Sequence, residues 1–134
     1  MKYQYYSNDI NKLADLSINE FFVFGSNLAG RHGKGAALFA KEYLHAETNI
    51  CVGFTGYCYA IPTKDYNLKT LSLNDIDNYV KLFKTVALNH EFHKFYVTKI
   101  GCGLAGYKDS DIAPLFIDSP INCKFHEDWK KYLE

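Results

Sequence analysis

The chain reads Phe22-Val-Phe-Gly-Ser-Asn-Leu-Ala-Gly-Arg-His-Gly-Lys-Gly-Ala-Ala-Leu-Phe-Ala40 over the stretch that organises it. This stretch begins in an apolar run, crosses a polar loop rich in glycine, and ends in residues that favour a helix. A strand, a glycine-rich loop and a helix in this order place backbone N–H groups and a helix N-terminus at the carboxyl end of the strand. Such an arrangement suits the anionic oxygens of a ligand, above all those of phosphate.

A second loop of the same character, Gly101-Cys-Gly-Leu-Ala-Gly106, also follows an apolar run. Glycine allows the backbone to approach a ligand closely and to adopt positive φ angles. Two such loops, each placed after a strand, predict that both contribute to one site.

The composition limits the classes of function. With 134 residues the chain is expected to form one domain over residues 1–134. Its 15 basic residues balance 15 acidic ones, so the total charge gives no reason to expect nucleic-acid or membrane binding. A zero net charge is still compatible with a local basic patch. The four cysteines lack metal-ligand spacing, which predicts reduced thiols and no metal or cofactor. No signal-peptide pattern or long apolar run is present, so we expect a cytoplasmic protein without a membrane segment.

Hydrophobic periodicity predicts alternating strands and helices. We expect a mixed, mainly parallel sheet between two helical layers, an α/β fold whose ligands bind beyond the carboxyl ends of the strands. Three loops meet that description: 25–35, 62–67 and 101–109. The expected strands are an edge strand near residues 1–6 and strands at 20–24, 57–61, 94–100 and 122–125. Residues 50–52 are expected either to form a short strand or to lead into a turn at 53–56. The expected helices are 36–45, a helix from its cap at Ser72 to about Asn89, 112–117 capped by Asp109 or Ser110, and a turn within 126–133 with Trp129 packed inward. Pro62 is expected to end its strand, and Asn8 or Asp9 to cap an early turn or helix.

The first loop holds candidate ligand-binding side chains. Asn27 offers a donor and an acceptor that could fix a ribose hydroxyl, or could instead cap the following turn. Arg31, His32 and Lys34 could neutralise phosphate, or could belong to a solvated loop. The loop is not a Walker A motif, because Gly35 and not a hydroxyl residue follows the lysine, and it lacks the glycine order of a Rossmann fingerprint.

Two further positions could carry chemistry. Lys64 and Asp65 follow a predicted strand and could act as general acid and base, or could form an exposed ion pair of little energetic value. Cys102 lies beside a predicted anion-binding loop, where the pKa of its thiol could fall. Because only His32 is placed to serve as its base, a small packed side chain is the preferred interpretation of Cys102.

Three segments together resemble the macro domain family. They are Gly30-Arg-His-Gly-Lys-Gly-Ala-Ala-Leu-Phe-Ala40, Tyr59-Ala-Ile-Pro-Thr-Lys64 and Ile100-Gly-Cys-Gly-Leu-Ala-Gly-Tyr107. They are most similar to the branch that contains the terminal ADP-ribose glycohydrolases, and also to phage and bacterial macro-like proteins. Ser7-Asn-Asp-Ile10 is similar to a macro-domain segment whose aspartate contacts adenine.

The resemblance implies a three-layer α/β/α macro-domain-like fold and a site for ADP-ribose or a related nucleotide, either free or attached to a macromolecule. Residues 30–36 would face the distal ribose and a phosphate, and residues 101–107 would wrap the diphosphate with their amides. The ligand-binding residues implied or suggested by position are Asp9, Ile10, Asn27, Arg31, His32, Gly33, Lys34, Gly35, Ala36, Thr63, Gly101, Cys102, Gly103, Leu104, Ala105, Gly106 and Tyr107.

One difference from the family bears on activity. The glycohydrolase branch has an aspartate after Gly-Cys-Gly-Leu, where this chain has Ala105. Asp65, Asp109 or Asp111 could replace that carboxylate only if the geometry allowed it. Three hypotheses follow. The first is a reader or sponge that binds without turnover. The second is a hydrolase that removes ADP-ribose from protein or nucleic acid, or dephosphorylates an ADP-ribose phosphate. The third is a module for another phosphorylated ligand or a protein partner.

Overall fold

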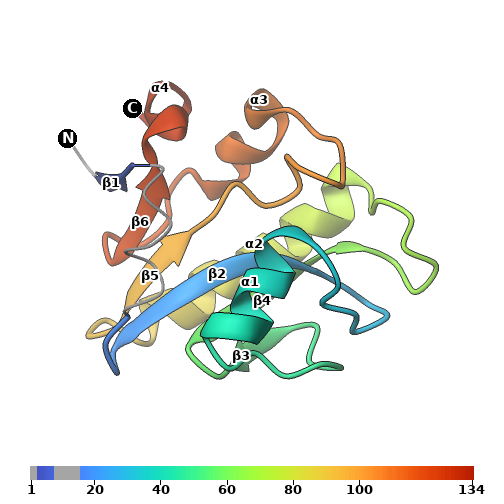
Figure 1. The fold of residues 1–134 in the computed structure, drawn as a ribbon. Coiled ribbons are helices and arrows are strands. Elements are labelled where there is room, and N and C mark those ends of the chain that lie inside the picture. Colours follow the sequence, from blue (N-terminus) through green and yellow to red (C-terminus); the bar gives the residue numbers. More distant parts are fainter. Residues whose placement is uncertain (1–2, 8–15) are drawn as a thin grey trace.

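The computed structural model describes residues 3–7 and 16–134, which form a six-stranded sheet with helices on both faces (Figure 1). The sheet has the order β1-β6-β5-β2-β4-β3, and neighbouring strands run parallel except for β3 and β4. The predicted α/β fold with a mixed, mainly parallel sheet is therefore confirmed, and β1 is an edge strand as expected. The strands are β1 (Gln4–Tyr6), β2 (Glu20–Asn27), β3 (Gly53–Thr55), β4 (Cys58–Lys64), β5 (Lys94–Val97) and β6 (Cys123–His126).

The helices divide between the two faces of the sheet. α1 packs on one face, and α2 packs on the other together with the segments that follow β5 and β6 (Figure 1). Ser72 caps α2 as predicted, because its hydroxyl accepts a bond of 3.1 Å from the Asp75 amide. Of the described helices, none is long and apolar enough to cross a membrane. They are α1 (Gly35–Tyr43), α2 (Leu73–Leu88), α3 (Asp109–Ile112) and α4 (Lys130–Leu133), with 3-10 helices at Ala113–Phe116 and Glu127–Trp129.

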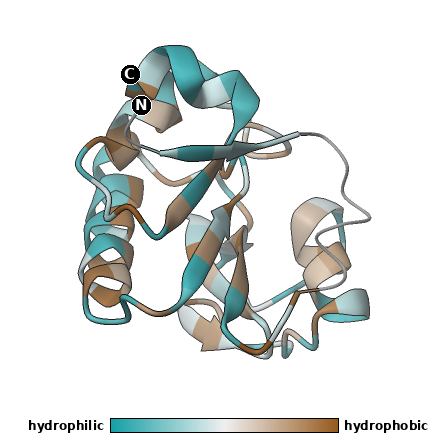
Figure 2. Ribbon diagram, turned by 90° about the vertical axis from the view of Figure 1, so that its left-hand side faces the viewer, coloured by the Kyte–Doolittle hydropathy of each residue, from teal (hydrophilic) through white to brown (hydrophobic). Residues whose placement is uncertain are grey.

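Strand β2 lies between the two hydrophobic cores. It pairs with β4 on one side and β5 on the other, and each of its faces contributes side chains to one core. Phe22 and Phe24 point into the core beneath α1, whereas Val23 points into the core beneath α2. All three side chains are fully buried, which is typical of a central parallel strand. Trp129 is also fully buried, as predicted, against Phe116 and Phe125. Figure 2 shows hydrophobic and hydrophilic residues side by side along the elements, as expected where each element buries one face.

Several predicted boundaries were wrong. β4 continues through Pro62 to Lys64, because β3 pairs with β4 only as far as Ala60 and a residue without an N–H is tolerated where a strand loses a neighbour. The short strand near residue 50 is instead β3, at Gly53–Thr55, which forms a hairpin with β4. Lys108, not Asp109 or Ser110, occupies the cap position of α3. The early turn near Asn8 lies outside the described residues.

Gly30 is needed for the fold of the first loop. Its φ of +72° is a left-handed conformation, and an added Cβ would lie 2.5 Å from the Cα of Asn49. The Asn49 amide also donates to the Gly30 carbonyl at 2.9 Å, so the two backbone segments cannot easily separate. By contrast, a Cβ at Gly33 would meet nothing within 4 Å.

We therefore expect Gly30→Ala to lower the free energy of unfolding by about 2–4 kcal/mol, through backbone strain and a steric clash. Gly33→Ala, the matched control in the same loop, should change it by less than about 0.5 kcal/mol. Urea unfolding of both variants measures the difference. Equal stability of the two would show that the backbone at Gly30 is not constrained in this way.

Candidate ligand-binding site

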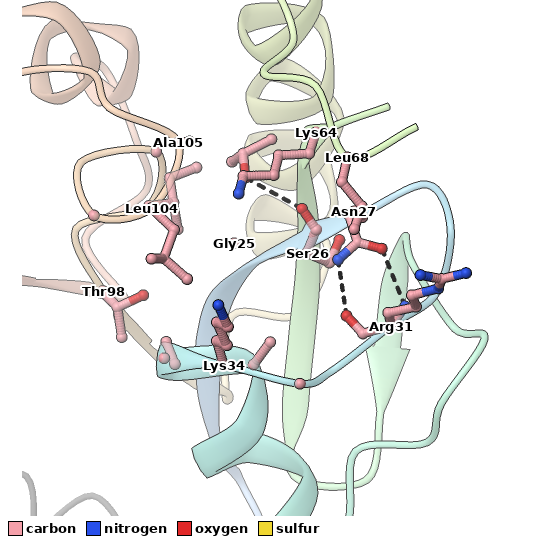
Figure 3. A pocket seen from close by; sticks show the side chains of 18 of the residues that line it. Gly25, Ser26, Asn27, Arg31, Lys34, Lys64, Leu68, Thr98, Leu104 and Ala105 are labelled. Atoms are coloured by element: carbon pink, nitrogen blue, oxygen red, sulfur yellow. Dashed lines mark hydrogen bonds between the residues drawn. The ribbon is translucent and has the colours of Figure 1, made fainter. Parts of the chain in front are cut away.

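A cavity of about 560 Å³ lies at the carboxyl ends of β2, β4 and β5 (Figure 3). The three loops predicted at this edge of the sheet contribute to it together. Its volume falls in the range of small-molecule and cofactor sites. The cavity is lined by Gly25, Ser26, Asn27, Arg31, Gly33, Lys34, Gly35, Ala36, Ala37, Thr63, Lys64, Leu68, Thr98, Lys99, Ile100, Gly101, Gly103, Leu104 and Ala105.

Asn27 braces the first loop. Its Oδ1 accepts from the Arg31 amide at 3.0 Å, and its Nδ2 donates to the Arg31 carbonyl at 2.8 Å (Figure 3). The side chain therefore holds the following turn, which was one of its two predicted roles, while it also lines the cavity. The Arg31 guanidinium points away from Lys34 and Lys64 (Figure 3).

The start of α1 presents backbone donors to the cavity. Lys34 occupies the N-cap position and its side chain makes no capping bond. The first amide with an acceptor in this turn is that of Leu38, which donates to the Lys34 carbonyl at 3.2 Å. The amides of residues 35–37 therefore have no acceptor among the described residues, and all three residues line the cavity. They form the positive end of the helix dipole. Figure 3 shows the Lys34 amine extending into the cavity.

His32 is not part of this wall. Its side chain is 3% exposed and meets the Phe24 ring edge-on at a centroid distance of 5.4 Å. Burial is the main cause that lowers the pKa of this imidazole. The Ile50 backbone opposes this shift, and the Lys41 charge adds a smaller lowering effect. A neutral imidazole packed in the core contributes no positive charge to the cavity.

Lys64 and Asp65 have separate roles. Lys64 is half-buried and lines the cavity, and within the described residues no carboxylate lies within ion-pair distance of its amine. The Asp65 side chain does not line the cavity. Its Oδ1 accepts from the Asn67 amide at 2.8 Å and from the Lys69 amide at 2.9 Å, which fixes the turn after β4. The predicted acid and base are therefore not brought together, although the neighbouring Thr63 does line the site.

Only part of the second glycine loop lines the cavity. Gly101, Gly103, Leu104 and Ala105 line the cavity, whereas Cys102, Gly106 and Tyr107 do not. Backbone bonds within the loop involve the amides of Cys102, Gly106 and Tyr107. The amides of residues 101, 103, 104 and 105 have no acceptor in the described part of the chain. This loop therefore offers a second group of backbone donors, opposite the start of α1.

The pKa of the Cys102 thiol is raised to about 12, not lowered as the sequence had suggested. Burial is the main cause, and the Asp109 carboxylate adds to it. A thiol in this state is a poor nucleophile at neutral pH. The interpretation of Cys102 as a packed side chain is thus the one that the structure favours.

Four basic residues and no acidic residue line the cavity, among the residues that the structure describes. Lys99 is compensated, because its Nζ lies 3.0 Å from an Asp128 oxygen and 3.5 Å from an Asp109 oxygen. The three remaining cations, Arg31, Lys34 and Lys64, have no such partner within the described residues. A chain with zero net charge thus concentrates positive charge at one cavity.

The candidate replacements for the missing loop carboxylate are all occupied elsewhere. Asp109 accepts a bond of 2.9 Å from Trp129 Nε1, and Asp111 accepts one of 3.1 Å from the Lys108 amide. Asp65 fixes its own turn, as described above, and none of the three lines the cavity. In the described part of the chain, no cluster of three or more His, Cys, Asp or Glu side chains could hold a metal ion.

Sequence reasoning missed some lining residues. Thr98 and Lys99 follow β5 directly, so the end of that strand could have identified them. Leu68 gives no such signal, because it reaches the cavity only through a turn in which its φ is +61°. Asp9 and Ile10, predicted to contact a base, lie outside the described residues.

Comparison with known proteins supports the fold alone. A solved structure of a protein of unknown function from Bacteroides thetaiotaomicron is similar, with a TM-score of 0.66 over 94% of this chain and 98% of that chain. The sequence identity is 18%, which carries no information about activity. Neither the protein-family models nor the curated proteins gave a match to this sequence.

The raised pKa of Cys102 predicts slow alkylation. At pH 8 its thiolate fraction should be about a thousandfold below that of a thiol with the ordinary pKa of 9.0. Iodoacetamide labelling followed by peptide mass spectrometry measures the rate, with an unfolded peptide of the same local sequence as the control. Labelling of the folded protein at the rate of the peptide would contradict the buried, protonated thiol.

Proposed function

We propose that the cavity binds ADP-ribose or a related nucleotide derivative and holds it without cleaving it, as a reader or sponge. The observation that carries the proposal is the chemistry of the wall. Two groups of backbone donors and the amines of Lys34 and Lys64 line one cavity. Among the described residues neither amine has an ion-pair partner, and no acidic side chain lines the cavity. Such a wall favours a ligand with several negative charges, because each amide and cation gains an anionic acceptor on binding.

A diphosphate fits this arrangement better than a single phosphate. The donors at residues 35–37 come from the start of α1, whereas those at residues 103–105 come from the opposite loop. Two linked phosphates could engage both groups at once. The volume of about 560 Å³ leaves room for a sugar beside them.

The resemblance to macro domains supplies the identity of the ligand. The three matching segments, 30–40, 59–64 and 100–107, all contribute residues to the cavity wall. An α/β fold with a mixed sheet is compatible with the same family. The chemistry of the wall and the resemblance are independent arguments, and both favour a nucleotide diphosphate.

Binding without turnover is the preferred alternative because no carboxylate lines the cavity among the residues that the structure describes. Ala105 lines the cavity where the glycohydrolase branch has its aspartate. Asp65, Asp109 and Asp111 accept hydrogen bonds elsewhere. A hydrolase would need a general acid or base at the bound ribose, and Lys64 alone would have to supply it.

We expect ADP-ribose to raise the melting temperature, since a ligand selective for the native state must stabilise it. Lys34→Ala and Lys64→Ala should each weaken binding about tenfold, through loss of a charge-assisted contact. Lys41→Ala on α1 and Lys69→Ala in the turn after β4 are matched controls, because both lysines are exposed and neither lines the cavity. Calorimetric titration at two salt concentrations measures these effects, and higher salt should weaken binding.

Four outcomes would count against the proposal. If millimolar ADP-ribose, NAD and cyclic ADP-ribose all leave the melting temperature unchanged, the proposal is wrong. Equal losses in the control variants would place the ligand outside the cavity. Release of ADP-ribose from a modified peptide or nucleic acid, abolished by Lys64→Ala, would favour the hydrolase. A phosphorylated ligand of another class, found in a nucleotide panel, would favour the third hypothesis.

Gly103→Val tests the second glycine loop separately. An added Cβ at Gly103 would meet nothing within 4 Å, so the variant should fold normally. Its side chain would stand at the cavity wall and keep a phosphate away from the loop amides. Binding of ADP-ribose should weaken at least about tenfold, while the melting temperature of the ligand-free protein stays within about 2 °C. Unchanged affinity would show that this loop does not contact the ligand.

A further inference from the structure

The second glycine loop depends on contacts outside itself for its shape. Its own backbone bonds are few: the Gly106 amide donates to the Gly103 carbonyl at 3.0 Å, and the Tyr107 amide to the Gly101 carbonyl at 2.8 Å. The loop contains three glycines, and each ordered residue costs about 1–2 kcal/mol of conformational entropy. Unless other contacts hold it, a ligand would have to order this loop on binding.

Two side-chain bonds connect the loop to the segment after β4, and they run in opposite directions. The Thr70 hydroxyl donates to the Ala105 carbonyl at 2.8 Å. The Tyr107 hydroxyl donates to the Leu71 carbonyl at 2.6 Å. Both contacts join residues about 35 positions apart in the sequence, so they connect the second glycine loop with the segment after β4.

The segment at Thr70 and Leu71 is itself fixed to the sheet. Thr70 forms an antiparallel bridge with Lys64, and the Leu71 amide donates to the Thr63 carbonyl at 2.8 Å. The turn between Lys64 and Thr70 is closed by the Asp65 amide, which donates to the Lys69 carbonyl at 2.7 Å. The second loop is therefore held against the end of β4, a strand buried along almost its whole length.

Thr70 itself does not line the cavity and is exposed, so it can act on a ligand only through the loop that it holds. A substitution at Tyr107 would be less selective, because its ring also packs against the core beneath α2. The Ala105 carbonyl that Thr70 engages belongs to one of the residues whose amides are available to a ligand.

We propose that Thr70 is a positioning residue, whose hydroxyl holds the second glycine loop in the conformation that presents amides 103–105 to an anion. Ordering the loop during folding removes part of the entropy cost from binding. The inference rests on the proposed function only for the choice of ligand, because the state of the loop can be measured without one.

The test compares Thr70→Val, which keeps the shape of the side chain but removes the hydroxyl, with Thr70→Ser, which keeps the hydroxyl. Thr85→Val is the control, because Thr85 also donates to a main-chain carbonyl, Lys81 at 3.2 Å, but lies on the exposed side of α2. Hydrogen exchange of amides 106 and 107 in ligand-free protein reports on the loop. Calorimetric titration with ADP-ribose reports on binding, and thermal unfolding on global stability.

We expect Thr70→Val to speed exchange at amides 106 and 107 about 3- to 10-fold and to weaken ADP-ribose binding by a similar factor. Thr70→Ser and Thr85→Val should behave as the unaltered protein in both assays. Unchanged loop exchange in Thr70→Val would overturn the inference, as would faster exchange throughout the protein with a matching fall in melting temperature. If the unaltered protein does not bind ADP-ribose, the proposed function fails, and the exchange data still decide the role of Thr70.

Discussion

The pairing of β2 with β4 is the interaction on which the cavity depends. The two strands run parallel from Phe22 and Cys58 to their carboxyl ends, where the register shifts between Ser26 and Asn27. Beyond the shift the chains stay attached, because the Leu28 amide donates to the Lys64 carbonyl at 2.9 Å and the Thr63 hydroxyl to the Ser26 carbonyl at 3.2 Å. The first glycine-rich wall follows β2 directly. The second follows β5 and is joined to the segment after β4 by the bonds of Thr70 and Tyr107.

The positions of the loops were predictable from sequence, whereas the partners of individual side chains were not. Apolar runs at 20–24, 57–61 and 94–100 identify parallel strands, and the carboxyl ends of parallel strands meet at one edge of a sheet. That argument needs no knowledge of packing. Loops 25–35 and 101–109 could be located in this way because their glycine content, and the apolar runs that precede them, are visible in the sequence itself.

The failures of sequence reasoning share a physical cause. His32 reads as a loop cation, but a contact with Phe24 draws it into the core. Asp65 reads as an acid beside Lys64, but two amides within its own turn bind its carboxylate first. For both residues a tertiary contact or a local hydrogen bond competes with the role that the residue type suggests. Cys102 is the exception, because its preferred interpretation as a packed side chain agrees with the burial that raises the pKa of its thiol.

The cavity lowers the stability of the ligand-free protein, because several of its charges and donors have no partner among the described residues. Lys34 and Lys64 lack an ion-pair partner among the described residues, and amides at residues 35–37 and 103–105 have no acceptor there either. A helix that began with Ser or Asp in place of Lys34 would cap its own first turn and gain about 1 kcal/mol. Stability lost in this way at two converging loops is expected where a ligand supplies the missing negative charge, because the same donors then stabilise the complex. The described part of this wall therefore has the charge and the free donors expected of a surface that binds an anion.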